Sequence, residues 1–323
     1  MHSHWLTHLL LWSLTNSVKK PKGTKGTGSI ALVKDAQKST ADVQPKPVSF
    51  KQYDRRSLSY ASTFGDPIKA TIIRIIEAFT GKLTVLRLIR KFEKKETPSG
   101  QAFWRAALDV MGIELTTPQS QLDRIPKSGP VIVVANHPHG MVDGMIFADL
   151  IGRVRPDYRI LTRSLLTAID EVAGSYMIAV PFAHDPDALQ KGVAMRAEAM
   201  QHLKDGGVVA LFPSGSVAAS ETFFGPAIEE EWNVFTAALI RRSGATVVPM
   251  HFPGQNSRAY QIANKLSPIL RQGLLLHEIV HSLNKPQGPI VGHPVADEDI
   301  AAWKGDPRGF MAWLRNHTLS LKD

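Results

Sequence analysis

The stretch Gly129-Pro130-Val131-Ile132-Val133-Val134-Ala135-Asn136-His137 sets four β-branched residues between a Gly-Pro turn and a polar segment. An apolar run of this length between turn residues is typical of a strand buried on both faces. Similar runs follow it, and strands are predicted over residues 131–134, 158–161, 177–180, 207–212 and 247–250. Helices are predicted between them, over residues 145–151, 164–172, 188–203 and 229–242. This alternation predicts an α/β fold, with a largely parallel sheet flanked by helices.

We place this α/β domain at residues 119–323. The residues that precede it differ from it in their charge and in the spacing of their apolar residues. Eighteen of the 38 Lys and Arg residues lie between Lys19 and Lys95, where only six Asp or Glu residues occur. Residues 1–50 are predicted to form a disordered basic arm, because residues 17–49 are rich in Lys, Gly, Thr, Ser and Pro. Residues 51–118 are predicted to form an N-terminal amphipathic helical region.

Apolar residues recur at helical spacing after Pro67, at Ile68, Ile72, Ile75, Ile76, Phe79, Leu83 and Leu86. Gly81 weakens a single continuous helix, so two helices or one kinked helix both fit the pattern. Lys and Arg fill intervening positions, and a basic amphipathic helix can lie on an anionic membrane. Packing of the same apolar face on the protein's own domain is a compatible alternative. No apolar run reaches the roughly 18 residues needed to span a bilayer, so peripheral association is expected.

Composition narrows the classes of site and partner. The chain has no cysteine, which excludes disulfides and thiolate metal sites. A Lys-rich arm binds nucleic-acid phosphates without specificity. No nucleic-acid-binding motif accompanies this arm, so no specific nucleic-acid partner is expected.

Polar loops follow three of the predicted strands. They are Asn136-His137-Pro138-His139-Gly140-Met141-Val142-Asp143 after the first strand, Pro213-Ser214-Gly215-Ser216 after Phe212, and His251-Phe252-Pro253-Gly254-Gln255-Asn256-Ser257-Arg258 after Met250. Sites of parallel α/β sheets form in loops at the carboxyl ends of the strands. If the three strands are neighbours, their loops meet in one cleft.

The first loop contains the residues of a general base and its orienting carboxylate. Asp143 can fix the tautomer of a nearby histidine, whose other nitrogen then takes a proton from an attacking hydroxyl. His137 and His139 are both candidates on these grounds. The chain has no G-x-S-x-G nucleophile elbow, which favours direct attack by a substrate hydroxyl over an acyl-enzyme. Gly215 and Gly254 allow backbone N–H groups to approach an oxyanion or a phosphate.

The chain resembles a known family in three motifs, namely Asn136-His137-Pro138 with Asp143-Gly144, Phe212-Pro213-Ser214-Gly215, and Val248-Pro249-Met250-His251-Phe252. They are similar to those of the phospholipid/glycerol acyltransferase superfamily, the PlsC-like lysophospholipid acyltransferases. The resemblance looks closest to the bacterial branch with an N-H-P-x-G-x-x-D-G motif, which includes hemolysin-like and ornithine-lipid acyltransferase-like proteins. The family commonly has four residues between His and Asp, but this branch shares the five that separate His137 from Asp143. The branch spacing therefore selects His137 as the base.

The resemblance implies the activity, the substrates and the roles of residues. His137 would be the general base and Asp143 its partner. The acyl donor would be acyl-acyl-carrier protein or acyl-coenzyme A, the acceptor a lysophospholipid or lyso-ornithine lipid, and no metal or other cofactor would be needed. The protein would lie at the cytoplasmic face of the inner membrane. Substrate-binding residues would be Asn136, His139, Gly140, Phe212, Pro213, Ser214, Gly215, Ser216, Pro249 and Arg258.

Two departures from the family pattern concern the acceptor. The third motif is usually F-P-E-G-T-R, whereas here Ser214 replaces the Glu and Val217 stands at the Arg position. The second motif, Ile178-Ala179-Val180-Pro181-Phe182, also lacks the Arg that is often found there. Arg is the natural bidentate ligand of phosphate. The acceptor head group therefore stays open, with Arg163 and Arg258 as candidates to replace the missing cations.

A rival motif, His277-Glu278-Ile279-Val280-His281, matches H-E-x-x-H. On a helix this spacing places two histidines on one face for zinc, with the Glu as general base of a metalloprotease. The usual third histidine is absent, and Glu298 is the conceivable third ligand. Acyl transfer is the preferred reading, with a zinc protease as the alternative.

Overall fold

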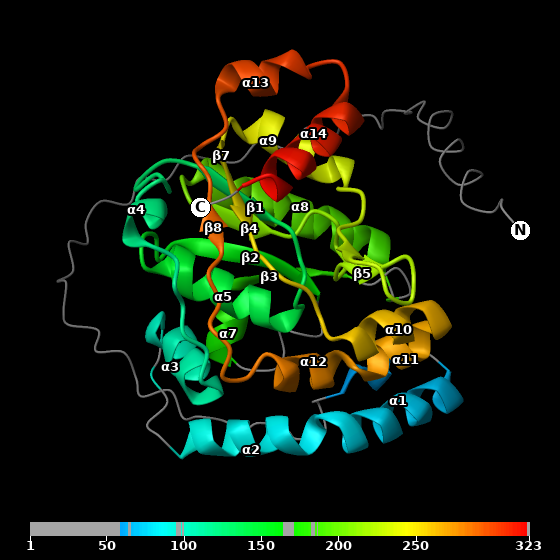
Figure 1. Cartoon of the computed structure of the whole chain (residues 1–323). Helices are drawn as coiled ribbons and strands as arrows, with labels where there is room; N and C mark the ends of the chain where they lie inside the picture. The colour runs from blue at the N-terminus through cyan, green and yellow to red at the C-terminus, as the bar shows by residue number, and fades with distance from the viewer. Residues whose placement is uncertain are drawn as a thin grey trace, which may run out of the picture. The chain divides into compact units, whose positions relative to one another are not determined.

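Strands and helices largely alternate from Val131 to His251, and the described segments on either side are mainly helical (Figure 1). The computed structural model describes residues 59–63, 66–94, 98, 100–163, 171–181, 185 and 187–321. The basic arm predicted over residues 1–50 lies outside them, as do residues 164–170 of a predicted helix. Residues 51–323 form one compact unit.

One six-stranded sheet organises this unit, and it consists of β1 (Val131–Ala135), β2 (Tyr158–Arg163), β3 (Met177–Val180), β4 (Val208–Leu211), β7 (Thr246–His251) and β8 (Ile290–Val291). The strand order is β3-β2-β4-β1-β7-β8, and only the β7–β8 pair is antiparallel. The largely parallel α/β sheet is thus confirmed. Because β1 pairs with both β4 and β7, the three polar loops leave the sheet side by side.

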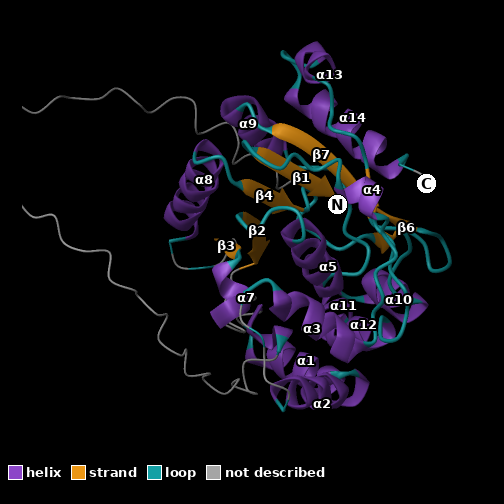
Figure 2. Cartoon of the chain, turned by 90° about the vertical axis from the view of Figure 1, so that its left-hand side faces the viewer, coloured by secondary structure: helices purple, strands orange, loops and turns teal. Residues whose placement is uncertain are grey.

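Helices cover both faces of the sheet (Figure 2). Val131 and Val133 of β1 face a core that includes α3 (Ala102–Met111), α5 (Met141–Gly152) and α12 (Leu275–His281). Ile132 and Val134 face a second core with α8 (Ala188–Lys204), α9 (Val234–Ser243) and α14 (Pro307–Leu319). Burial on both faces explains why the strand is apolar without alternation.

The region before the sheet is helical, with α1 (Pro67–Thr80) and α2 (Lys82–Glu93) joined at Gly81. The two-helix option is therefore the observed one. A Cβ on Gly81 would lie 2.7 Å from the carbonyl oxygen of Leu276 in α12, a distance that no side chain permits. Gly81 thus allows the junction to approach α12 closely.

Shorter elements complete the unit, namely η1 (Tyr60–Thr63), α4 (Gln119–Leu122), α7 (Glu171–Ser175), the hairpin β5 (Ala219–Ser220) and β6 (Ala227–Ile228), α10 (Arg258–Leu266), α11 (Pro268–Gly273) and α13 (Asp297–Ala302). Across the described part of the chain, no helix is both long and apolar enough to cross a bilayer.

Two predicted helix starts were wrong. The helix predicted from Glu229 begins at Val234, because the side chain of Asn233 caps it by accepting from the Phe235 N–H at 2.8 Å. Glu229 instead follows β6 and is buried. The helix predicted from Met145 begins at Met141, directly after Gly140, whose φ of 72° favours glycine. Asp143 therefore lies in the first turn of α5, where a negative charge is favourable.

Candidate active site

His137 and Asp143 are held together in the loop between β1 and α5. Nδ1 of His137 lies 3.0 Å from Oδ2 of Asp143, whose side chain is fully buried. An ionised carboxylate only accepts hydrogen bonds, so Nδ1 carries the proton and Nε2 is left with a free lone pair. This is the tautomer that a general base needs.

His139 shares the same carboxylate. Its backbone N–H donates to Oδ2 of Asp143 at 2.8 Å, and its Nδ1 lies 3.0 Å from Oδ1. Burial alone would raise the pKa of Asp143, but hydrogen bonds from the two histidines hold that pKa below its usual value. Burial alone would lower the pKa of His139, but the hydrogen bond and charge of Asp143 raise it above its ordinary value. His139 therefore helps to fix Asp143 in place.

The two histidines differ in access. His137 lines a cavity of about 240 Å³, and its ring stacks on Phe212 with centroids 3.9 Å apart. His139 is not part of the cavity wall. The backbone at Gly254 lies so close to its Nε2 that a Cβ on Gly254 would be only 3.0 Å away. Of the two histidines, only His137 thus combines the fixed tautomer with a position that lines the cavity.

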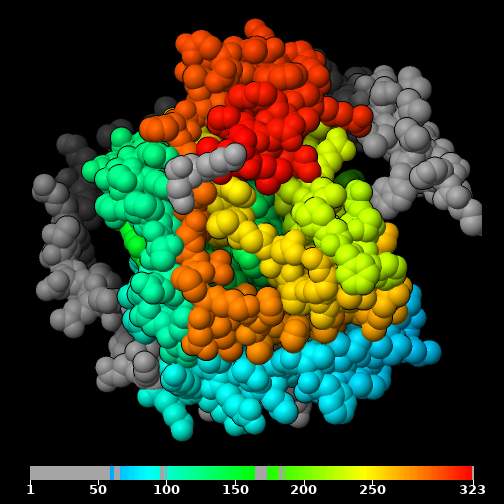
Figure 3. Space-filling model, in the orientation of Figure 1, coloured from blue at the N-terminus to red at the C-terminus, as the bar shows by residue number. Residues whose placement is uncertain are grey.

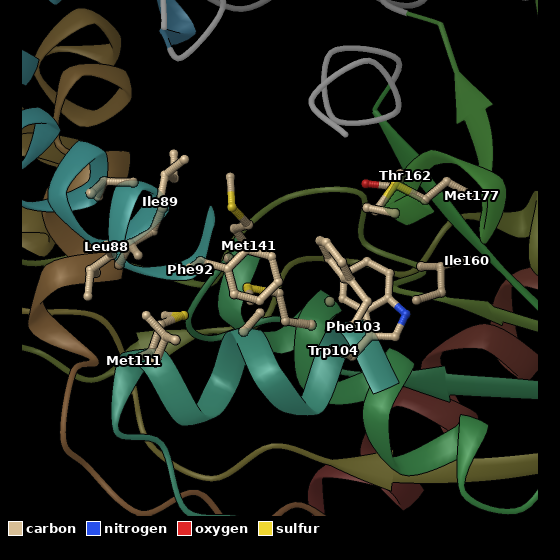
Figure 4. A pocket seen from close by; sticks show the side chains of 18 of the residues that line it. Leu88, Ile89, Phe92, Phe103, Trp104, Met111, Met141, Ile160, Thr162 and Met177 are labelled. Atoms are coloured by element: carbon tan, nitrogen blue, oxygen red, sulfur yellow. The ribbon is translucent and has the colours of Figure 1, made fainter. Parts of the chain in front are cut away.

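The rest of the cavity wall is almost entirely apolar (Figure 4). It comes from α2, α3, α5 and the strands β2 and β3, and includes Leu88, Ile89, Phe92, Phe103, Trp104, Met111, Met141, Ile160 and Met177. Such a wall suits a hydrocarbon chain.

The three loops meet as predicted. Asn136 spans two of them, because its amide donates to the Phe252 carbonyl at 2.8 Å and accepts from the Phe252 N–H at 2.7 Å. The Ala218 N–H, beyond the second loop, donates to the His137 carbonyl at 2.9 Å. The buried Asn136 therefore fastens the first and third loops to each other.

The second loop lies beside His137. Gly215 has a φ of 68°, and its carbonyl lies 3.4 Å from Nη2 of Arg163 at the end of β2. The Ser214 hydroxyl donates to the Ser216 carbonyl at 3.0 Å. Pro213 accepts the Asn233 N–H at 3.0 Å, which ties this loop to the start of α9.

Three predicted binding residues occupy different settings. Gly140 lines the cavity next to His137. Pro249 lies within β7, paired with Val134, so it belongs to the sheet rather than to the loop. Arg258 opens α10 and donates to the Gly225 carbonyl at 2.7 Å, which anchors the β5–β6 hairpin. The structure does not bring Pro249 or Arg258 to His137.

The carboxylate of Glu229 belongs to the site and was not predicted. Its Oε2 accepts the backbone N–H of His137 at 3.0 Å, across 92 positions of sequence. Glu229 is followed by Glu230 and Glu231, and nothing in the sequence distinguishes the buried carboxylate from the two exposed ones.

The H-E-x-x-H segment has a structural role. Glu278 is buried and accepts the Ser257 N–H at 2.7 Å and the Ser257 hydroxyl at 2.6 Å, so both its oxygens hold the third loop. Glu298 lies in α13, at the opposite end of the unit from α12 (Figure 1). Among the described residues, no group of three or more His, Asp or Glu side chains is placed to hold a metal ion.

The raised pKa of His139 predicts a pH-dependent contribution to stability. The unfolded histidine titrates near 6.5, so the stabilisation from its protonated form is complete below that pH and is lost as pH rises through the higher folded value. We expect the Tm difference between the parent protein and His139→Gln to shrink as pH rises from 6 to 9. His293→Gln, at an exposed position, controls for histidine loss. A difference that stays constant with pH would contradict this role.

One comparison with known protein families bears on this site. Residues 119–252 match the protein family described as Acyltransferase. The chain is also similar to the crystal structure of the 1-acyl-sn-glycerophosphate (LPA) acyltransferase PlsC from Thermotoga maritima, with 16% identity, a TM-score of 0.43 and coverage of 78% of this chain and 93% of that one. A comparison with curated proteins gives no match.

The chain thus contains an acyltransferase domain, and the protein is an enzyme of the acyl-group-transfer class. The matched residues include the His137–Asp143 pair, the Phe212–Ser216 loop and most of the parallel sheet.

Proposed function

We propose that the protein transfers a fatty acyl group from acyl-acyl-carrier protein or acyl-coenzyme A to the hydroxyl of a lyso-lipid. Nε2 of His137 takes the hydroxyl proton while the oxygen attacks the thioester carbonyl. The carbon–sulfur bond then breaks, and the imidazolium returns the proton to the departing thiolate. The ester and the free thiol are the products, and no acyl-enzyme forms.

One observation carries this proposal: His137, oriented by the buried Asp143, forms part of the wall of an apolar cavity. An acyl chain in that cavity would bring its thioester carbonyl toward Nε2. A substitution that narrows the cavity should therefore change which acyl chains the enzyme uses.

The surroundings of His137 also bear on the acceptor. Arg163 lies at the Gly215 loop and suits an acidic group on the head group. A second cavity, of about 900 Å³, is lined by carboxylates of Glu221, Glu229, Glu230 and Glu231 and by the cations Lys265 and Arg315. This mixture supports a zwitterionic head group, such as that of a lyso-ornithine lipid, alongside the lysophospholipid alternative.

Acyl transfer can be tested with purified protein, acyl donors of several chain lengths, and lysophosphatidic acid or lyso-ornithine lipid as acceptor. Ala107 lines the cavity, so Ala107→Phe should shift the preference between long and short donors at least about tenfold toward the short ones. Ala102→Phe, at an exposed position of the same helix, is the matched control. Failure of every donor and acceptor with the parent would refute the proposed activity.

We also propose that the helical region over residues 51–118 holds the acyltransferase domain, residues 119–323, on an anionic membrane. Helix α1 packs on its own unit through Ala70, Ile73 and Glu77, which are buried. The opposite face carries Ile68, Ile72, Ile75 and Phe79, all exposed. The fold thus leaves one apolar stripe of α1 without a partner among the described residues.

The neighbourhood of this stripe is consistent with a bilayer. Helices α1 and α2 run along one edge of the unit, with α10, α11 and α12 directly beside them (Figure 3). Leu266 of α10 and Leu270 of α11 add exposed apolar surface there, and Lys69, Arg74 and Lys82 supply positive charge. Apolar insertion flanked by cations is typical of peripheral binding to anionic lipid. We place this surface at the cytoplasmic face of the inner membrane, where the proposed donors occur.

If α1 binds the membrane, a charged residue in its exposed apolar stripe should weaken binding to anionic vesicles. Phe79 is 88% exposed, and Phe79→Glu should weaken co-sedimentation with anionic vesicles by about tenfold or more, because it removes one inserted aromatic ring and adds a negative charge. Leu189 is 81% exposed on α8, so Leu189→Glu is the control and should leave binding unchanged. Equal losses from the two changes would rule out a specific role for α1.

A further inference from the structure

Glu229 is a buried residue whose two carboxylate oxygens both accept hydrogen bonds. Its Oε2 accepts the His137 backbone N–H at 3.0 Å, and its Oε1 accepts the indole N–H of Trp232 at 3.0 Å. Arg315 of α14 donates through Nε, at 3.0 Å, and through Nη2 to the backbone carbonyl of Glu229.

These donors come from separate parts of the site. His137 follows β1, and Trp232 precedes α9. One carboxylate therefore joins the loop after β1 to the segment before α9. The His137 peptide is held on both sides, because its carbonyl accepts from Ala218 while its N–H donates to Glu229.

Burial of a carboxylate is costly unless its charge is compensated. Burial raises the pKa of Glu229, and the hydrogen bonds from His137 and Trp232, with the charge of His137, act against that rise.

We propose that Glu229 is a positioning residue for acyl transfer, which fixes the His137 peptide and places a second negative charge beside the general base. The inference rests on the proposed function of His137. When His137 takes the hydroxyl proton, Asp143 stabilises the imidazolium directly and Glu229 does so through the electrostatic field. Loss of either charge should make the base weaker.

The charge and the reach of Glu229 can be separated by two substitutions. Glu229→Gln keeps the length but removes the charge. It should lower kcat by about 10- to 100-fold, leave the donor KM within about threefold, and move the acid limb of the kcat/KM pH profile to lower pH. Glu229→Asp keeps the charge but withdraws it from the His137 N–H. It should lower kcat while leaving the acid limb at its parental position.

Glu198→Gln, at an exposed carboxylate of α8 that lines neither cavity, is the matched control and should keep kcat within about twofold. Tm measurements on every variant report folding, and if Glu229→Gln does not fold, Glu229→Asp still tests the positioning role through kcat. A folded Glu229→Gln with parental kcat, or a lower Tm with an unmoved acid limb, would overturn the proposal. An inactive parent would instead remove the proposed function itself.

Discussion

His137→Ala should lower kcat for acyl transfer by about 10²- to 10⁴-fold, because it removes the group that takes the proton from the attacking hydroxyl. Binding of the acyl chain is expected to survive, since the cavity wall is otherwise apolar and His137 is one residue of many that line it. The effect should therefore fall on kcat far more than on the donor KM. Steady-state assays with a saturating acceptor measure both quantities.

The neighbouring histidine provides the control for this prediction. His139 contacts Asp143 but does not line the cavity, so His139→Ala should reduce activity less than His137→Ala does. If His139→Ala abolished transfer while His137→Ala retained it, the base would have been assigned to the wrong histidine. His293→Ala, at an exposed position, should leave kcat unchanged.

Asp143→Asn should cost both activity and stability. We expect kcat to fall by about 10³- to 10⁴-fold, because an amide no longer enforces the His137 tautomer with its free Nε2. Asp143 accepts from Nδ1 of His137 and from both Nδ1 and the backbone N–H of His139. An Asn side chain offers only one oxygen to these donors, so the free energy of unfolding should drop by about 1–3 kcal/mol. Urea unfolding measures the loss.

A matched substitution at Asp149 distinguishes the loss of activity at Asp143 from the loss of stability. Asp149 lies on the same helix as Asp143, is also buried, and pairs with Arg105 at 2.9 Å and Arg153 at 2.5 Å. Asp149→Asn should therefore lower stability while kcat stays near the parental value. If both substitutions reduced kcat to the same extent, the loss at Asp143 would reflect general destabilisation rather than its contact with His137.

Much of the site could be predicted because it depends on local pattern. The apolar run over residues 131–134 marks a strand buried on both faces, and a polar loop after such a strand lies at the carboxyl edge of the sheet. His137 and Asp143 are six positions apart, so one tight turn brings their side chains together. The convergence of three loops could be stated only as a condition, which the β4-β1-β7 order fulfils.

The remainder depends on contacts between distant segments. Glu229 begins a run of three glutamates, and any of them could have started a helix or faced solvent. The cavity wall combines Phe92 of α2, Trp104 of α3 and Met177 of β3. Their helical or strand spacing predicts an apolar face, but it does not say which faces leave space between them.

The order of the strands β1, β2, β3, β4 and β7 along the chain, the polar loops that follow β1, β4 and β7, and the pairing of a histidine with Asp143 could be predicted from the sequence, because each follows from spacing within about ten residues. The choice of His137 over His139 came from the resemblance. Tertiary structure decided which histidine faces the cavity, which face of α1 stays exposed, and that Glu229 holds His137. These outcomes depend on strand order and on how helices pack across the sheet. Such outcomes are set by the free energy of the whole fold, which includes contacts between distant segments, so the spacing of nearby residues does not determine them.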